Sequence, residues 1–166
     1  MQKYAFLDRD GTILIEQDDE DFLKSATFEE LTDLKFVNGA LEGLDLLAKK
    51  GFKLVLVTNQ PYLGTPKRPK KIYDVVTSKM NEELTKRNLY FDFVMMCPHG
   101  ADEDCDCRKP KIGGLRSFLD TNKGHIDFEH SLMFGDRNSD EGFANNLKVR
   151  FVRIETNEQF MLPDDI

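Results

Sequence analysis

Short apolar runs alternate with segments of helical periodicity along the whole chain, and this alternation limits the folds that the chain can adopt. Each run is four to six residues long, which is the length of a buried strand. The runs cover residues 3–7, 52–57, 91–96, 131–134 and 149–154. Between them, apolar residues recur at helical spacing over residues 39–50, 70–87, 114–122 and 140–147. This order predicts an α/β fold, a Rossmann-like open parallel sheet with helices on both faces.

The first predicted helix has signals at both ends. Asn38 is expected to cap its N-terminus, and Gly51 is expected to close it after the C-terminal cap. The preceding segment from Glu16 to Asp21 is strongly acidic, and such a segment is usually solvated loop. Its place directly after the first strand and turn leaves a substrate-facing role open as the alternative.

The chain is expected to form one domain over residues 1–166, because this length suits a single hydrophobic core. No segment is large enough for a separate cap domain, and residues 155–166 are expected to be a tail or the start of a linker. There is no apolar run of membrane-spanning length and no signal-like N-terminus, which predicts a cytoplasmic protein without membrane partners. The formal charge of −7 argues against a nucleic-acid partner, although local cations could still bind a small phosphorylated substrate.

Two carboxylates stand where the first predicted strand ends, in the stretch Asp8-Arg9-Asp10-Gly11-Thr12. Asp8 and Asp10 share a face if the extended conformation continues between them. Carboxylates held together repel each other, and a divalent cation relieves that repulsion. Ligands of open α/β sheets bind at the carboxyl ends of the strands. An isolated Asp-x-Asp is usually an acidic turn, but the longer pattern after an apolar strand predicts a reactive site.

Other polar residues follow the later predicted strands. Thr58 and Asn59 follow the second strand, and Lys109 lies in the loop after the third. Asp136 and Asp140 follow the fourth. Each of these alone is ordinary turn or surface chemistry. Together they could supply the donors and the cation that a transferring phosphoryl group needs, and oxygen ligands for Mg²⁺.

All three cysteines of the chain lie within eleven residues, together with a histidine, as Cys97, His99, Cys105 and Cys107. Their odd number, without a signal peptide, disfavours a disulfide framework. Three thiolates and an imidazole suit tetrahedral Zn²⁺, and four protein ligands leave no open position, so this metal is expected to be structural. The alternative is a reduced, inert cysteine loop. A metal-bound loop would position Lys109, which follows it closely.

The strand-end residues resemble the motifs of the haloacid dehalogenase superfamily of phosphatases. The stretch that begins at Asp8 is similar to the first motif. The later motifs are similar to Thr58, Lys109 and Gly135-Asp136-Arg137-Asn138-Ser139-Asp140. The resemblance implies that Asp8 is a nucleophile that becomes an aspartyl-phosphate and that Asp10 is the general acid/base. Thr58 and Lys109 would bind the phosphoryl group. The side chains of Asp8 and Asp136 and the carbonyl of Asp10 would hold a catalytic Mg²⁺, with Asp140 orienting them from behind.

The cysteine loop narrows this resemblance to the zinc-loop phosphatases of the superfamily. The stretch Thr58-Asn59-Gln60-Pro61-Tyr62-Leu63-Gly64-Thr65 and the run Cys107-Arg108-Lys109-Pro110-Lys111 favour the histidinol-phosphate phosphatase branch. That branch implies a Mg²⁺-dependent phosphomonoesterase with a zinc-stapled loop, which hydrolyses L-histidinol phosphate in histidine biosynthesis. Many bacteria fuse it to an imidazoleglycerol-phosphate dehydratase domain. The alternatives are a D-glycero-D-manno-heptose 1,7-bisphosphate phosphatase and, from another class, a non-catalytic zinc-stapled binding module.

Three residues are predicted to contact the substrate: Glu16, Asn59 and Arg108. The non-reacting end of histidinol phosphate is cationic or nearly so, and an acidic wall formed by Glu16, with Asp18 and Asp19 behind it, would attract that end. A sugar bisphosphate would instead bring a second dianion and need extra cations. Such cations could come from Lys67, Arg68, Lys70, Lys71, Arg108 and Lys111. The first four of them are more simply explained as a solvated helix start.

Overall fold

The computed structural model describes residues 1–17, 20–66 and 68–166. Within these residues the chain forms a five-stranded sheet in the order β3-β2-β1-β4-β5. The strands are β1 (Lys3–Leu7), β2 (Phe52–Asn59), β3 (Phe93–Cys97), β4 (Leu132–Gly135) and β5 (Arg150–Arg153). Each strand pairs with its neighbours in parallel. The predicted parallel α/β sheet is therefore confirmed.

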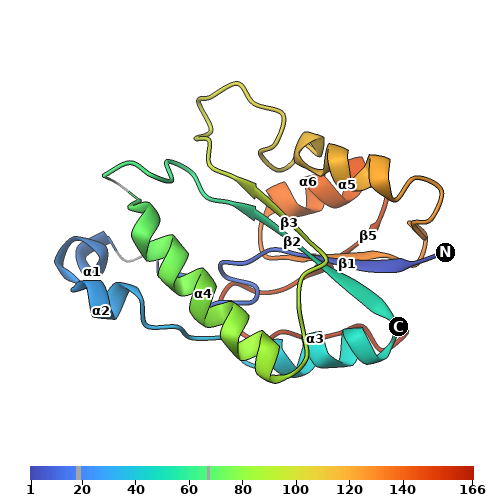
Figure 1. The fold of residues 1–166 in the computed structure, drawn as a ribbon, viewed down its shortest axis with the longest axis horizontal. Coiled ribbons are helices and arrows are strands. Elements are labelled where there is room, and N and C mark those ends of the chain that lie inside the picture. The colour runs from blue at the N-terminus through green and yellow to red at the C-terminus, as the bar shows by residue number, and fades with distance from the viewer. Residues whose placement is uncertain (18–19, 67) are drawn as a thin grey trace.

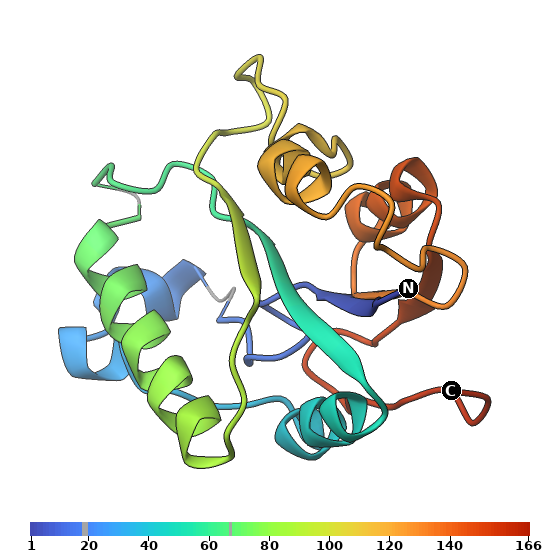
Figure 2. The same cartoon turned by 45° about the vertical axis from the view of Figure 1, so that its right-hand side comes forward.

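Helices cover both faces of the sheet (Figures 1 and 2). One face is covered by α3 (Ala40–Lys49) and α4 (Lys70–Lys86). The other is covered by α5 (Arg116–Thr121), which follows the 3₁₀ turn η1 (Gly113–Leu115), and by α6 (Asn138–Leu147). No helix in the described ranges combines the length and the apolar character that a membrane crossing needs.

Side chains that alternate along β1 separate two hydrophobic cores. Ala5 and Leu7 point into the core beneath α3 and α4. Tyr4 and Phe6 point into the core beneath α5 and α6. All four side chains are buried. Strands buried on both faces need apolar residues at every position, which explains why they read as continuous apolar runs in the sequence.

Two short helices, α1 (Glu20–Ser25) and α2 (Phe28–Leu31), lie beside α4, and α1 begins within the acidic segment (Figures 1 and 2). The loop interpretation was wrong for Glu20 and Asp21, because they form the first turn of α1, whereas Glu16 does lie in a loop. Carboxylates are favourable at that end of a helix. Helices this short do not complete an apolar repeat that a sequence pattern can reveal. They are the only insertion between β1 and α3 in the residues that the structure covers, so no large cap domain is present there.

The predicted C-terminal signal of α3 is confirmed, and the predicted N-terminal cap is wrong. Gly51 follows the helix with φ 83°, in the left-handed region, as predicted for its closing residue. Asn38 does not cap the N-terminus: Gly39, with φ 78°, occupies the cap position without a side-chain bond. The carbonyl of Asn38 instead accepts a 2.8 Å hydrogen bond from the amide of Phe160. A contact across more than a hundred residues therefore decides the local structure here.

Part of the segment 155–166, expected to be a tail or the start of a linker, packs against the body of the protein. Phe160 is only 4% exposed, and its ring stacks on Phe134 with 5.1 Å between centroids. It packs over Gly43, where a Cβ would come within 2.6 Å of Phe160 Cε1. Leu162 packs against the same core. An aromatic side chain buried this deeply attaches the segment to the core.

Candidate active site

The carboxyl ends of the strands form one edge of the sheet, and most of the predicted site residues lie there. Asp8 directly follows β1, Thr58 lies near the end of β2, and Asp136 directly follows β4. Lys109 reaches the same edge from the loop after β3. The side chains of Asp8, Thr58 and Lys109 are buried. The parallel topology thus brings together residues that are far apart along the chain.

A buried ammonium joins two carboxylates at this edge. Lys109 Nζ lies 2.6 Å from Asp8 Oδ1 and 2.7 Å from Asp140 Oδ1, and it donates to the carbonyl of Val57 at 2.8 Å. Burial alone would lower the pKa of Lys109, but the charges of Asp8 and Asp140 outweigh it and raise that pKa. Lys109 is therefore held as a cation against both carboxylates.

The same burial acts on Asp8 in the opposite sense. It raises the pKa of Asp8 to about 7; the Lys109 ammonium opposes this shift, and the Asp140 carboxylate adds to it. One ammonium does not fully compensate two buried carboxylates. A second cation beside Asp8 would stabilise the carboxylate form that a nucleophile requires.

The carboxylates at this edge fit a hard metal ion. Asp8, Asp136 and Asp140 can each offer one oxygen, and these oxygens lie within 4.8 Å of one another. The side chain of Asp136 is 1% exposed. Buried oxygen ligands of this kind suit Mg²⁺. Asp140 accepts a 2.9 Å hydrogen bond from the Arg137 amide and faces Lys109, which ties it to the protein rather than to solvent.

The side chain of Asp10 points to a different set of partners. Arg9 donates to its two oxygens at 3.0 and 3.1 Å, and Gln60 Nε2 donates to Oδ2 at 2.6 Å. Arg9 is itself buried and lies over the ring of Tyr73, 4.7 Å from the centroid. The Asp10 carboxylate is thus held at a defined place, and a contribution of Asp10 to a metal ion would have to come from its main-chain carbonyl.

Gln60 is a site residue that the sequence reasoning missed. It is 1% exposed, and its Nε2 donates to Thr58 Oγ1 at 2.8 Å as well as to Asp10. Its Oε1 accepts a 2.9 Å bond from Arg68. The available signal was its position directly after the Thr58-Asn59 pair, but Pro61 next to it made the position read as loop.

Asn59 and Arg108, predicted to contact the substrate, both make hydrogen bonds within the protein. Asn59 Oδ1 accepts from the Lys109 amide at 3.0 Å, and its Nδ2 donates to the Lys109 carbonyl at 3.3 Å. Arg108 donates to the carbonyl of His99 at 3.1 Å. Both side chains therefore hold the loop that carries Lys109.

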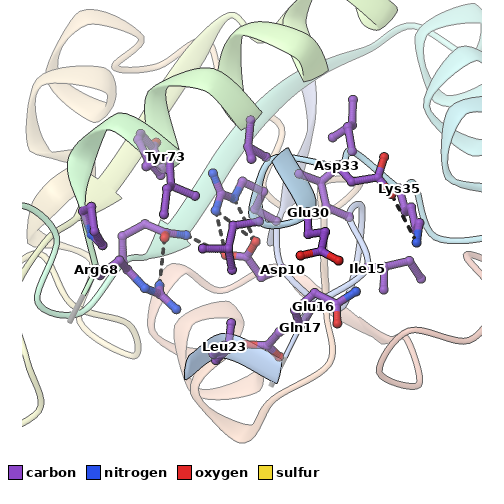
Figure 3. A pocket seen from close by; sticks show the side chains of 18 of the residues that line it. Asp10, Ile15, Glu16, Gln17, Leu23, Glu30, Asp33, Lys35, Arg68 and Tyr73 are labelled. Carbon is purple, nitrogen blue, oxygen red and sulfur yellow. Dashed lines mark hydrogen bonds and ion pairs between the residues drawn. The ribbon is translucent and has the colours of Figure 1, made fainter. Parts of the chain in front are cut away.

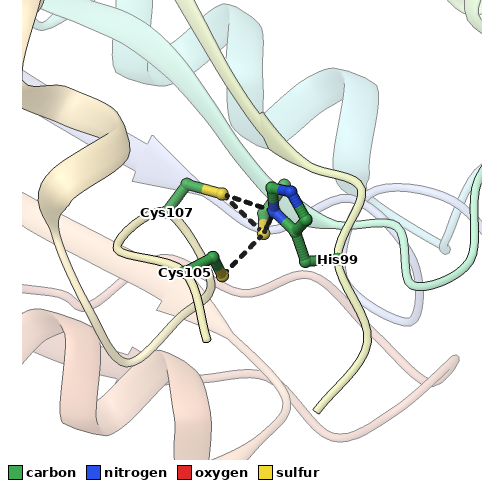
Figure 4. Close-up of side chains that lie close together, drawn as sticks. His99, Cys105 and Cys107 are labelled. Carbon is green, nitrogen blue, oxygen red and sulfur yellow. Dashed lines mark hydrogen bonds between the residues drawn. The ribbon is translucent and has the colours of Figure 1, made fainter. Parts of the chain in front are cut away.

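The four predicted zinc ligands converge on one point (Figure 4). Cys97 Sγ, at the buried end of β3, lies 3.5 Å from His99 Nδ1 and 3.8 Å from Cys105 Sγ. Cys107 Sγ lies 3.2 Å from His99 Nδ1. A tetrahedron with zinc–sulfur bonds of about 2.3 Å has edges of about 3.8 Å. The Cys97–Cys105 separation matches this edge, whereas Cys107 Sγ lies closer to Cys97 Sγ, at 2.7 Å. The cluster fits a zinc-binding loop.

The chemistry of the thiols agrees with a cation at this point. Burial, together with the neighbouring Cys97 and Cys105 thiols, raises the pKa of Cys107 to about 12. Several thiolates this close together are unfavourable unless a cation compensates them, and Zn²⁺ would do so. Lys111 Nζ also donates to the Cys105 carbonyl at 2.7 Å, which ties the loop to the residues that follow Lys109.

A cavity of about 340 Å³ opens beside Asp10 (Figure 3). It lies between the turn after β1, the two short helices and the start of α4. Apolar groups form much of its wall, among them Leu14, Leu23, Ile72, Tyr73 and Val76. Its charged residues within the described ranges are the acids Asp10, Glu16, Glu30 and Asp33 and the bases Arg9, Lys35 and Arg68. The cavity is therefore amphipathic, with a small excess of acid.

Two residues that the sequence analysis considered for substrate binding line this cavity. Glu16 lines the cavity, and its carboxylate pairs with Arg137 at 2.5 Å, so its charge is partly compensated. Arg68, expected in a solvated helix start, also lines the cavity. By contrast, Lys70 pairs with Asp74 on the exposed surface of α4. Three residues of these predictions lie outside the described part of the chain: Asp18, Asp19 and Lys67.

Comparison with known proteins then decides the family. The model of the polynucleotide kinase 3 phosphatase family matches residues 3–160. The chain belongs to this family. It is a phosphatase of the haloacid dehalogenase superfamily, as the sequence motifs indicated, and its sheet, helices and cysteine loop agree with that assignment.

Relatives and solved structures agree with the family assignment. The Histidine biosynthesis bifunctional protein HisB of Campylobacter jejuni subsp. doylei is 41% identical over 150 residues, covering 90% of this chain and 40% of that protein. The chain thus spans about 40% of the length of the curated relative. D,D-heptose 1,7-bisphosphate phosphatase from B. bronchiseptica, complexed with magnesium and phosphate, has a TM-score of 0.73 at 26% identity, over 90% of this chain and 79% of that chain. A Had-superfamily hydrolase from Ehrlichia chaffeensis, 16% identical over 97% of this chain and 92% of that chain, shares the fold with a TM-score of 0.56.

Proposed function

We propose that this phosphatase hydrolyses L-histidinol phosphate to L-histidinol and phosphate through an aspartyl-phosphate on Asp8. The observation that carries the catalytic part is the buried cluster in which Lys109 joins Asp8 and Asp140 beside Asp136. The substrate is supported by the 41% identity to a protein of histidine biosynthesis. In nature we propose a fused dehydratase domain as partner, because the relative is a bifunctional protein more than twice as long.

The reaction proceeds in two displacements. A carboxylate oxygen of Asp8 attacks phosphorus, the new P–O bond forms, and the bond from phosphorus to the substrate oxygen breaks. Asp10 gives its proton to that leaving oxygen, which departs as the alcohol. Water then attacks phosphorus, Asp10 takes the proton, and the bond to Asp8 breaks, which releases inorganic phosphate and restores both carboxyl groups.

The surrounding residues stabilise the charge of the transferring group. Lys109 and the Thr58 hydroxyl face its oxygens, and Gln60 holds Thr58 and Asp10 at a defined separation. The side chains of Asp8 and Asp136 and the carbonyl of Asp10 would hold Mg²⁺, and Asp140 would orient this set. When bound, the ion neutralises phosphate charge and favours the ionised form of Asp8.

The zinc loop acts through Lys109 rather than on the substrate. Zinc bound by the four converging ligands would fix the loop whose end carries Lys109. The two hydrogen bonds between the Asn59 side chain and the Lys109 main chain fix that backbone from the other side. A closed set of four protein ligands leaves no position for a reacting water, so this zinc is structural.

The cavity beside Asp10 is the proposed site for the rest of the substrate. Its apolar wall with Tyr73 suits a flat imidazole ring, and its carboxylates could pair with a primary ammonium. A hydroxylated sugar would make few favourable contacts with this apolar wall. The alternative substrate, a heptose 1,7-bisphosphate, is favoured by one observation, the presence of Arg68 in the wall and Arg137 next to it.

A direct comparison of substrates tests the proposal. We expect Mg²⁺-dependent phosphate release with the highest kcat/KM on L-histidinol phosphate, against D-glycero-D-manno-heptose 1,7-bisphosphate and a 3′-phosphorylated oligonucleotide. A marked preference for the bisphosphate would assign the alternative substrate. The oligonucleotide is expected to be the poorest because the chain carries a charge of −7. No release from any phosphomonoester would favour the non-catalytic zinc-binding module.

A further inference from the structure

The segment that follows β5 touches the candidate site from a side that no sequence motif indicated. We define residues 154–160 as the strap. Its first residue, Ile154, donates to the carbonyl of Gly135 at 2.9 Å, which continues the pairing of β5 with β4. Its last residue, Phe160, is buried in the core and donates to the Asn38 carbonyl at 2.8 Å. The strap is thus held at both ends by main-chain hydrogen bonds.

The first contact of the strap is with a metal-site carboxylate. Thr156 Oγ1 donates to Asp136 Oδ2 at 2.7 Å. The same oxygen also lies close to Gly11, where a Cβ would come within 2.6 Å of Asp136 Oδ2 and 3.1 Å of Thr156 Cγ2. The other oxygen of Asp136, Oδ1, accepts from Thr12 Oγ1 at 3.4 Å. Asp136 is therefore held both by the turn after β1 and by the strap, and the bond from Thr156 is the shorter of the two.

The second contact is with the wall of the cavity. Asn157 has φ 62°, in the left-handed region, which Asn tolerates better than most residues. Its side chain pairs with both main-chain groups of Glu16: Oδ1 accepts from the Glu16 amide at 2.6 Å, and Nδ2 donates to the Glu16 carbonyl at 2.9 Å. Its own amide donates to the Gly11 carbonyl at 2.9 Å. Asn157 thereby fixes the backbone from which Glu16 enters the cavity.

We propose that the strap is a positioning element with two separable contacts: Thr156 sets the affinity for the magnesium ion through Asp136, and Asn157 sets substrate affinity through Glu16. Neither residue touches the reacting atoms. The inference rests on the proposed function, in which Asp136 is a metal ligand and Glu16 faces the substrate. Partners that orient metal ligands are worth about 10- to 100-fold in metal affinity.

The first arm of the test measures metal binding without turnover. Mn²⁺ serves as the probe, with free ion counted by electron paramagnetic resonance and Mg²⁺ added as competitor. We expect Thr156→Val to weaken Mn²⁺ binding about 10-fold or more, and Thr156→Ser, which keeps the hydroxyl, to stay close to the parent. Binding by the Val variant equal to that of the parent would overturn this part of the inference.

The second arm measures kcat and KM for L-histidinol phosphate. Asn157→Gly removes the side chain and keeps the left-handed backbone accessible, so we expect KM to rise several-fold while kcat and Mn²⁺ affinity change less than about twofold. Asn157→Asp retains the acceptor and loses the donor, and an intermediate KM is expected. Equal loss of kcat and Mn²⁺ affinity in the Gly variant, or an unchanged KM, would overturn the role of Asn157.

The parent protein separates failure of the inference from failure of the proposed function. A parent that binds no Mn²⁺ in competition with Mg²⁺ contradicts the proposed metal site itself. A parent that binds Mn²⁺ while Thr156→Val binds it equally well contradicts only the strap. In the same way, a parent inactive on L-histidinol phosphate contradicts the proposed substrate, whereas an active parent with an unchanged Asn157→Gly variant contradicts only the second contact.

Discussion

At the scale of single residues, the chemistry depends on a carboxylate that is buried and yet must be ionised. Asp8 carries a pKa raised to about 7 by burial, and Lys109 lies 2.6 Å from it as the nearest compensating charge. Substitution of Asp8 by Asn keeps the shape and removes the nucleophile. We expect the Asp8→Asn variant to lose phosphatase turnover by about 10⁴-fold or more, measured as phosphate release from L-histidinol phosphate.

A matched control for this variant is Asp74→Asn. Asp74 is 51% exposed and pairs only with Lys70 in the contacts described here, on the surface of α4. Exposed ion pairs of this kind contribute little, so this variant should keep the parent activity. Substantial Mg²⁺-dependent turnover by Asp8→Asn would contradict the assignment of the nucleophile.

A second residue-scale prediction concerns the glycine that ends β4. A Cβ at Gly135 would lie 2.6 Å from Asp140 Oδ2, so Gly135→Ala must push Asp140 away from Lys109. We expect an activity loss of about 10-fold or more and a stability loss of about 1–3 kcal/mol, as for other overpacked sites. Phosphate release and urea unfolding measure the two effects. Parent-like activity would show that the position of Asp140 does not matter for turnover.

At the scale of elements, the cysteine loop links a metal site to a catalytic cation. The loop runs from Cys97 at the end of β3 to Lys109, and its four ligand atoms lie within 4.8 Å of one another. We expect one zinc per chain by elemental analysis of the purified protein. Removal of the zinc should lower both the unfolding temperature, by about 5 °C or more, and the activity, because the loop no longer positions Lys109.

The two metals can be told apart in that experiment. Washing with EDTA followed by Mg²⁺ alone should leave a zinc-depleted protein impaired, whereas Mg²⁺ with Zn²⁺ should restore it. Cys105→Ser should behave like the zinc-depleted protein. A Cys105→Ser variant as stable and active as the parent, or purified protein without zinc, would contradict the structural role of the loop.

At the scale of the whole molecule, the last residues of the chain complete the core. Phe160 stacks on Phe134 and is 4% exposed. We expect Phe160→Ala to lower the free energy of unfolding by about 3–5 kcal/mol, the usual range for a buried aromatic truncated to alanine. Met161→Ala is the control: its parent side chain is 62% exposed, so a change within about 0.5 kcal/mol is expected. Urea unfolding curves of the two variants measure the difference, and equal stabilities would contradict the docking.

The sequence by itself determined the alternating strands and helices, the strand-end carboxylates and the cysteine cluster. These features are local, because a strand is recognised from a few consecutive apolar residues and the metal ligands lie within eleven positions. The parallel topology follows from the alternation, and it carries Asp8, Thr58 and Asp136 to one edge without further information.

Only the tertiary structure decided which side chains hold that edge in place. The Asn59 side chain forms hydrogen bonds with the backbone of Lys109, fifty residues away, and Asn157 forms hydrogen bonds with Glu16 across 141 residues. Such bonds join polar residues that look like ordinary turn or tail positions in the sequence. Their partners become neighbours only when the sheet and its covering segments have packed, because a hydrogen bond needs both groups within about 3 Å and local pattern contains no information about that distance.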